Sequence, residues 1–380
     1  MSDGSSARAR SGSTGATRPS RWHRAGVTQR TERALDVGGR VLVLLLAAGW
    51  TWTIATDRSL GAGATSVLTA ALTSSSAPTA AYLTDASLNA LAGELRGTSG
   101  KLRAQITTAG SALEADSVPE GATLTVADPQ ASGTGIAPKA GIWRLAVAVG
   151  KAIKPITDIN LISLRPRSEK QNGRVGLYYL GSWPGETGGK VNAPSKAPAD
   201  RYRPPSGFIE VTQGNADTRL SEHFKLRDFL THDQPNVWPK YLVIELRNID
   251  KLELVLSDLA SRGVDISGVK VMSGFRTPQY NKGGGRTGGR AGLSRHMYGD
   301  AADIYIDSDG NGNMDDLNHD GRITIDDSRV VLQALDRVEA AHPELVGGGG
   351  VYPAAPGHGP FIHIDARGYR ARWVGGPGGG

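Results

Sequence analysis

The chain has 380 residues, enough for two modest domains. Its formal charge of +6 is concentrated at the N-terminus, where residues 1–40 hold eight Arg and no Lys against three acidic residues. The remainder is close to neutral and predicts no groove for nucleic acid, while the lack of cysteine excludes disulfides and thiolate metal sites.

The N-terminal region predicts a membrane anchor. Residues 1–40 are rich in Ser, Gly, Thr and Arg, which favours a disordered, basic cytoplasmic tail. Residues 41–56 are uncharged and mostly apolar, so we predict a single-pass transmembrane signal anchor in the inner (cytoplasmic) membrane, although a spanning helix usually needs roughly 20 residues. A cleaved signal peptide ending near Ala62-Gly63-Ala64 and a buried core helix are the alternatives. On either of the first two interpretations, the remaining chain is periplasmic or otherwise extracytoplasmic.

Two regions of different composition follow the predicted anchor. Residues 57–120 are rich in small residues, and we expect a partly helical spacer there, with leucines on one face between Leu88 and Arg103. Residues 121–215 are expected to form a β-rich module whose ligand the sequence does not identify. Its predicted strands are 145–149, 159–164, 175–180 and 207–211.

The C-terminal region, residues 220–374, has an α+β pattern. We predict helices over 242–261 and 327–341, where apolar residues recur every three or four positions. Predicted strands cover 269–274, 301–306 and 361–365. The expected fold class is therefore α+β, with a small antiparallel sheet and flanking helices, preceded by the β-rich module and the N-terminal transmembrane helix.

Three side chains in this region suit a zinc ion. His296 and Asp303 lie seven residues apart, in a loop and on the strand that follows it, and His363 lies on the last predicted strand. Zinc takes histidine nitrogen and carboxylate oxygen, and catalytic zinc usually has three protein ligands. Because side chains alternate along a strand, His363 and Asp365 share one face.

The surrounding motifs resemble a known superfamily. Ser-x-His-x-x-Gly-x-Ala-x-Asp at 294–303, the segment Ser273–Asn281 before it and Phe-Ile-His-Ile-Asp at 361–365 are similar to the zinc D-Ala-D-Ala carboxypeptidase or Hedgehog-type superfamily. The murein endopeptidase K-like group shares the last motif and a nearby Arg-Trp, here at 372–373. The resemblance, over about 220–374, implies zinc ligands at His296, Asp303 and His363, and peptidoglycan peptides as substrates. It also implies that Arg276 holds a substrate carboxylate or developing negative charge.

The general base is not evident from these motifs. Many relatives carry a histidine two residues before the last ligand or an acid three to six before it, and this chain carries Phe361, Pro360 and Gly357 there. Asp365 is the candidate catalytic base, and its alternative role is to orient a ligand imidazole or pair with Arg367. A non-catalytic, zinc- and calcium-stabilised cell-wall binding module therefore stays open as an alternative.

An acidic insert at 307–327 predicts calcium binding. Its second half has oxygen ligands at EF-hand positions 1, 3, 5, 9 and 12 and glycine at position 6, and the residue at position 7 would offer its carbonyl. The first half matches less well, and the two twelve-residue frames overlap at 316–318, so both cannot be complete. The insert resembles EF-hand or dockerin loops. The candidate ligands are Asp307, Asp309, Asn311, Asp315, Asp316, Asn318, Asp320, Arg322, Thr324 and Asp327.

Overall fold

The computed structural model describes residues 85–128, 131, 135–198, 200–283 and 290–376. The chain is α+β, with mostly antiparallel sheets and few helices, as expected from its sequence. The predicted basic tail and the predicted anchor at 41–56 lie outside the described residues. Within the described ranges, no helix is both long and apolar enough to cross a bilayer.

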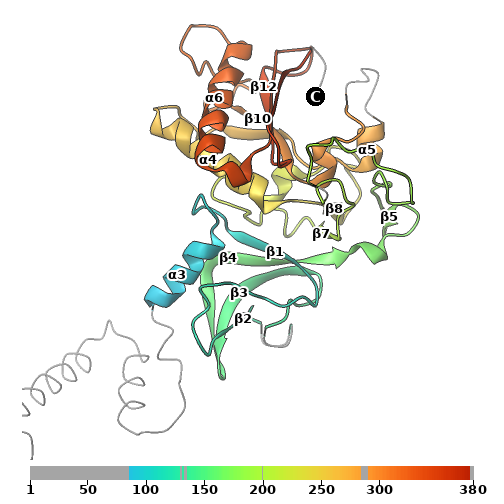
Figure 1. The fold of residues 1–380 in the computed structure, drawn as a ribbon, viewed down its shortest axis with the longest axis vertical. Coiled ribbons are helices and arrows are strands. Elements are labelled where there is room, and N and C mark those ends of the chain that lie inside the picture. Colours follow the sequence, from blue (N-terminus) through green and yellow to red (C-terminus); the bar gives the residue numbers. More distant parts are fainter. Residues whose placement is uncertain (1–84, 129–130, 132–134, 199, 284–289, 377–380) are drawn as a thin grey trace, which may run out of the picture. The chain divides into compact units, whose positions relative to one another are not determined.

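A six-stranded sheet forms the first half of the fold (Figure 1). Its strands run in the order β2-β3-β4-β7-β8, and β1 pairs in parallel with β4. The long strand β4 pairs with β3 along most of its length and with β7 at its end. The strands are β1 (Ala104–Thr108), β2 (Thr123–Val126), β3 (Gly141–Val149), β4 (Ala152–Pro166), β7 (Gly207–Val211) and β8 (Lys240–Leu242). A short hairpin, β5 (Arg174–Val175) and β6 (Tyr178–Tyr179), lies between β4 and β7 in the chain.

The described part of the expected spacer, residues 85–120, is folded into this half of the molecule. Helix α3 (Asp85–Leu95) buries Leu91 and Leu95 in a cluster with residues of β2, β3 and β4. The helix is shorter than the predicted one, because the chain turns at Gly97, which has φ +73°. A Cβ atom at this glycine would lie 2.8 Å from the carboxylate of Asp250.

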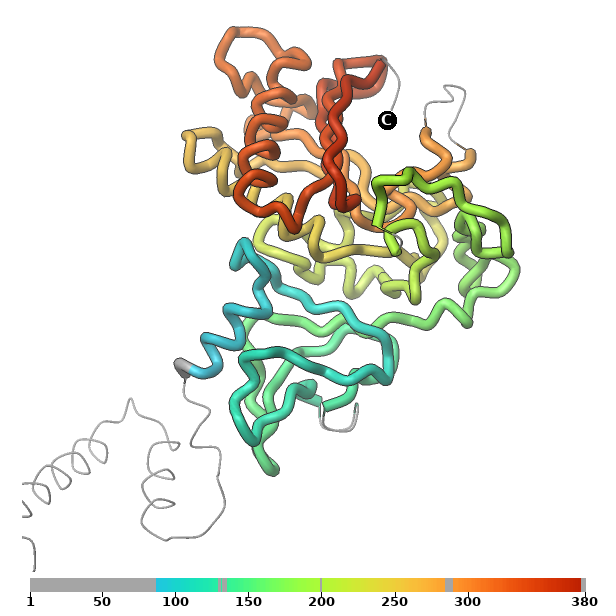
Figure 2. The backbone as a smooth tube through the Cα atoms, in the orientation of Figure 1, coloured from blue at the N-terminus to red at the C-terminus, as the bar shows by residue number. Residues whose placement is uncertain are grey.

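A five-stranded sheet forms the second half, in the order β13-β11-β12-β10-β9. Helices α4 (Leu246–Ser261) and α6 (Ile325–Ala341) pack against each other and against this sheet (Figures 1 and 2). Helix α4 begins four residues later than predicted, because Lys240–Leu242 pairs with β7 as β8. The strands are β9 (Val269–Ser273), β10 (Ala301–Ile306), β11 (Gly348–Tyr352), β12 (Phe361–Asp365) and β13 (Ala371–Val374). The short helical elements are η3 (Arg167–Glu169), η4 (Leu226–Phe229), α5 (Pro278–Lys282), η5 (Arg295–Tyr298) and η6 (Pro343–Leu345).

One apolar core joins the two sheets. It contains Ile162 of β4, Phe208 of β7, Leu252 of α4 and Ile362 of β12, each with no more than a trace of exposure. The core is therefore continuous across residues 215–220, where the sequence predicts a boundary between two domains.

Strand β11 is built largely of glycine. A Cβ at Gly349 would lie 2.6 Å from the side chain of Leu335 in α6, and one at Gly350 would lie 2.2 Å from the indole of Trp373. Real Cβ atoms do not approach other atoms so closely, so α6 and Trp373 fit against this strand only because it lacks side chains.

A buried lysine ties the two helices to β12. Lys251 of α4 is fully buried, and its Nζ donates to Oε1 of Glu339 in α6 at 2.6 Å and to the carbonyl oxygen of Asp365 at 2.7 Å. Glu339 also accepts hydrogen bonds from Gly347 and from Arg372. Each charge of this network is thus paired inside the protein, as burial of charge requires.

Candidate metal centre

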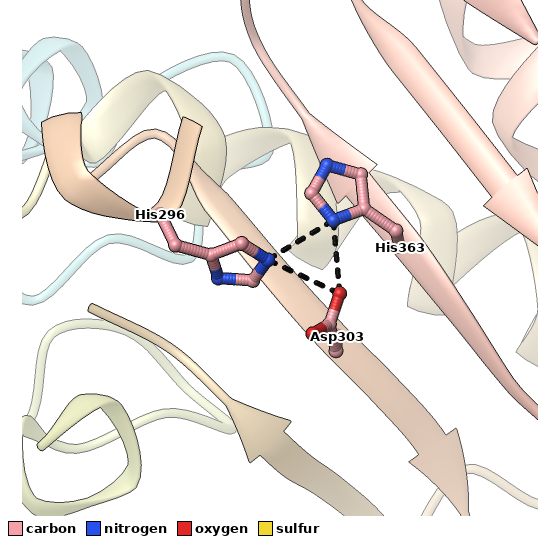
Figure 3. A group of neighbouring side chains, drawn as sticks. All are labelled: His296, Asp303 and His363. Atoms are coloured by element: carbon pink, nitrogen blue, oxygen red, sulfur yellow. Dashed lines mark hydrogen bonds and ion pairs between the residues drawn. The ribbon is translucent and has the colours of Figure 1, made fainter. Parts of the chain in front are cut away.

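Three buried side chains converge between η5, β10 and β12 (Figure 3). His296 lies in η5, Asp303 on β10 and His363 on β12, and the last two face each other across the antiparallel pair. Nδ1 of His363 lies 2.9 Å from Oδ1 of Asp303 and 3.1 Å from Nε2 of His296, and these last two atoms are 3.2 Å apart. The structure therefore brings together the three residues that the sequence singles out.

The turn between η5 and β10 sets the position of His296. Gly299 ends η5 with φ +75°, and a Cβ there would lie 2.4 Å from the carbonyl oxygen of Val243, so the turn requires glycine. Arg295 and Asp300 flank the turn and form a buried bidentate ion pair at 2.9 and 2.5 Å. This ion pair holds together the two ends of the turn between η5 and β10. The spacing of Arg295 and Asp300 in the sequence did not predict this role.

Hydrogen bonds on the far side of each imidazole fix its tautomer. Nδ1 of His296 lies 2.7 Å from the carbonyl oxygen of Gly274, which can only accept, so Nε2 presents a lone pair. Nε2 of His363 lies 2.9 Å from Oδ2 of Asp365, which directs the Nδ1 lone pair toward Asp303. With neutral imidazoles, three acceptors face one another, and a cation between them would satisfy all three.

The donor set and its spacing fit zinc. In a tetrahedral site with bonds of about 2.0–2.1 Å, ligand atoms stand about 3.3 Å apart. The three separations here, 2.9, 3.1 and 3.2 Å, are close to that value. Two nitrogens and one carboxylate oxygen leave a fourth position, as in catalytic sites.

The electrostatics of the cluster also favour a cation. Burial lowers the pKa of His296 to about 4, with the charge of Arg276 adding to the effect, so this imidazole is neutral near pH 7. Burial alone would lower the pKa of His363, but its contacts with Asp303 and Asp365 outweigh burial and raise it. Burial opposes ionisation of Asp303, yet His296 and Arg276 hold its pKa well below the usual range. The cluster thus attracts positive charge, as either a proton or a metal ion.

Arg276 lies beside the three residues. Its Nη2 donates to Oδ2 of Asp303 at 2.6 Å and its Nε to Oγ of Ser273 at 2.8 Å. The side chain is buried, yet it lines a cleft of about 270 Å³. Within the described part of the chain, its Nη1 has no hydrogen-bond partner and is free to meet a ligand in that cleft.

Asp365 lies behind His363, on the side away from the convergent atoms. Its oxygens contact Nε2 of His363, the backbone N–H of Gly348 and the guanidinium of Arg367. The residue is fully buried, and contacts with His363 and Arg367 hold its pKa well below the usual range although burial opposes this. These contacts favour an orienting role for Asp365 over that of general base.

The variant Asp365→Asn separates the two roles. An orienting carboxylate fixes the imidazole and raises its basicity, so its neutralisation is expected to weaken zinc binding about 10- to 100-fold. Competition with a chromophoric chelator measures this affinity. If Asp365 is instead the general base, the variant keeps its zinc affinity and loses only turnover.

The cleft over the metal centre is lined by cations and aromatic rings. Arg290 and Arg367 reach it together with Tyr352 and Trp373, whose Nε1 donates to the Tyr352 hydroxyl at 2.9 Å. The ring of Trp373 lies 5.2 Å from that of His363. Among the described residues that line this cleft there is no carboxylate. Of Arg290, Tyr352, Arg367 and Trp373, the sequence motifs drew attention only to Arg367 and Trp373, and placed neither of them in a cleft.

The acidic insert lies at the end of β10, away from the three convergent residues. One carboxylate oxygen from each of Asp307, Asp309 and Asp315 lies within 4.8 Å of the others. The carboxylates of the second half, Asp316, Asp320 and Asp327, form no such group among the described residues. Asp327 instead caps α6, with Oδ2 accepting from Thr324 N–H and Oδ1 from Leu317 N–H. Both oxygens of Asp316 accept from backbone N–H groups of its own loop.

Comparison with known proteins gives no relative from which to assign this site. No family, no curated protein and no solved structure matches the chain.

Proposed function

We propose that this chain is an exported, membrane-anchored zinc peptidase that hydrolyses peptide bonds in peptidoglycan stem peptides or cross-links. The observation that carries the proposal is the convergence of His296, Asp303 and His363, with lone pairs directed at one point beside an open cleft. The substrate class rests on the sequence motifs, and the membrane anchor rests on residues 41–56 alone.

The residues around the site suit hydrolysis of an amide. Zinc, when bound, supplies Lewis-acid polarisation of a carbonyl and activation of water near neutral pH. Arg276 presents a fixed positive charge beside the site, where negative charge develops on a substrate carbonyl. Its hydrogen bond to Asp303 holds both side chains in place, so little reorganisation is needed during the reaction.

The cleft favours an anionic peptide. Arg290 stacks on Tyr280 at 4.2 Å and donates to its carbonyl oxygen, with no carboxylate partner among the described residues. Arg367 is already paired with Asp365 and packs over Trp373. A free carboxylate on a stem peptide would complement Arg290, because guanidinium groups bind carboxylates through charge-assisted hydrogen bonds.

One observation favours a second candidate function. A general base must lie within hydrogen-bond reach of the water that it activates. Among the described residues no carboxylate lines the cleft, Asp303 is itself a proposed zinc ligand, and Asp365 is hydrogen-bonded to the far side of His363. A non-catalytic module that binds the cell wall, with zinc as a structural ion, accounts for this arrangement.

Mass spectrometry of purified muropeptides incubated with the full-length protein distinguishes the two functions. A peptidase is expected to release shorter peptides, to stop in the presence of a chelator and to resume when zinc is added. Arg276→Ala should keep its zinc and lose at least about 100-fold in turnover, by analogy with loss of a transition-state donor. Stoichiometric zinc with no cleavage of any muropeptide would favour the binding module.

A further inference from the structure

The acidic loop after β10 carries a second group of potential metal ligands. One carboxylate oxygen from each of Asp307, Asp309 and Asp315 lies within 4.8 Å of the other two. They occupy positions 1, 3 and 9 of a twelve-residue frame that has Asn311 at position 5 and Gly312 at position 6. From these residues and the observation that follows, we propose that this first frame, 307–318, binds one calcium ion.

Asp307 provides independent support for a ligand at this place. Its side chain is 4 % exposed, and its Oδ1 has no hydrogen-bond partner among the described residues. The other oxygen, Oδ2, accepts from the N–H of Gly312 at 3.1 Å. A buried carboxylate oxygen without a partner costs free energy, and a cation held with Asp309 and Asp315 would supply the missing partner.

The structure selects the first frame although the second matches the motif better. In the second frame, Oδ2 of Asp327 accepts from the backbone N–H of Thr324, the N-cap of α6, and Oδ1 accepts from the backbone N–H of Leu317 in the loop. Asp327 is also fully buried, so binding a cation through either oxygen would disturb the helix cap or the bond to the loop backbone. Both oxygens of the residue expected at position 12 of the second frame are therefore already hydrogen-bonded to backbone N–H groups.

The chemistry of the donors favours calcium among common cations. All of them are oxygens, which hard cations prefer, whereas zinc and copper favour sites with nitrogen or sulfur. Asp309, Asn311 and Asp315 line an open cavity of about 420 Å³, which gives water and a cation access. Position 12 of this frame is Asn318 and lacks the usual bidentate Glu, so we expect a Kd between about 10⁻⁵ and 10⁻³ M.

The loop is hydrogen-bonded to the end of β10 and lies against the residues just before β12. Asp307 and Asp315 hold the end of β10 through backbone bonds to Gly268 and Ile306, at 3.0 and 2.8 Å. The side chain of Asn313 lies so close to Gly359, just before β12, that a Cβ there would be 2.8 Å from its Oδ1. Calcium in this loop would therefore restrain the end of β10 and the start of β12.

Isothermal titration of the zinc-loaded full-length protein with calcium alone tests the assignment, and it does not depend on any peptidase activity. The wild-type chain is expected to bind one calcium and to melt at a higher temperature with calcium than without. Asp309→Asn should weaken binding at least tenfold. Asp320→Asn, an equally exposed position in the second frame, is the matched control and should change the Kd less than about twofold.

Two further measurements guard against misfolding and against nonspecific charge effects. Without calcium, Asp309→Asn should melt at the wild-type temperature, and Asp307→Asn should reproduce the loss of binding. Absence of calcium binding at 10 mM calcium would overturn the proposal. The proposal would also be overturned if Asp320→Asn lost as much calcium affinity as Asp309→Asn, or more, because either result would contradict the assignment to the first frame.

Discussion

Replacing His296 by alanine is expected to reduce bound zinc from one ion per chain to less than about a tenth of that. The variant leaves one imidazole and one carboxylate, and stable zinc sites in proteins need at least three protein ligands. Any hydrolysis of muropeptides should fall to background with the metal. Elemental analysis after dialysis against a weak chelator measures the zinc, and mass spectrometry measures the hydrolysis.

His232→Ala is the matched control for this loss. His232 is exposed and is not among the residues that line the cleft, and its Nε2 lies 2.9 Å from the carbonyl oxygen of Met272. It should keep both its zinc and its activity. Full zinc occupancy in His296→Ala would refute the metal centre, whereas loss of zinc in both variants would indicate nonspecific binding through surface histidines.

The second large effect is on stability. Lys251→Met is expected to lower the free energy of unfolding by about 3–5 kcal/mol, because removal of one partner leaves the Glu339 carboxylate buried with one fewer cation. It also removes the donor to the carbonyl oxygen of Asp365. Equilibrium unfolding in urea, followed by circular dichroism, measures the change.

Lys151→Met provides the comparison at an exposed position, where substitutions usually stay within about 0.5 kcal/mol. Adding Glu339→Gln to Lys251→Met should recover part of the stability, since the amide keeps hydrogen-bond acceptors without the unpaired charge. A loss below about 1 kcal/mol in Lys251→Met would show that the buried network contributes little.

Local patterns predicted much of the second half of the fold. Strand β12 coincides with the predicted 361–365, β10 with 301–306, and α6 begins two residues before the predicted helix because Thr324 caps it. These segments have strong β-branched or helical periodicity, so their type follows from short-range preferences. The three convergent residues could be predicted from the sequence for the same reason, since two of them lie on such strands.

Features that depend on residues far apart in the sequence could not be predicted from local patterns. The continuous core across residues 215–220 arises because β7 and β8 pair, and neither strand signals its partner. The pairing of Lys251 with Glu339 joins residues 88 positions apart. The motif assigned calcium ligands to both frames of the insert, and the gathered carboxylates of the first frame, the unpartnered Oδ1 of Asp307 and the bonds of Asp327 distinguish the two.

Strand β11 has an unusual consequence for how the sheet is assembled. Three consecutive positions, Gly348 to Gly350, lack side chains, so the usual alternation of inward and outward residues cannot select their alignment. The alignment must be imposed from outside, by the stacked rings of Tyr352 and Phe361 at 4.6 Å and by the indole that lies against Gly350. The cleft wall thus depends on a segment, Gly348 to Gly350, whose side chains set no register of their own. A shift of β11 by one residue along its neighbours would displace Trp373 from His363.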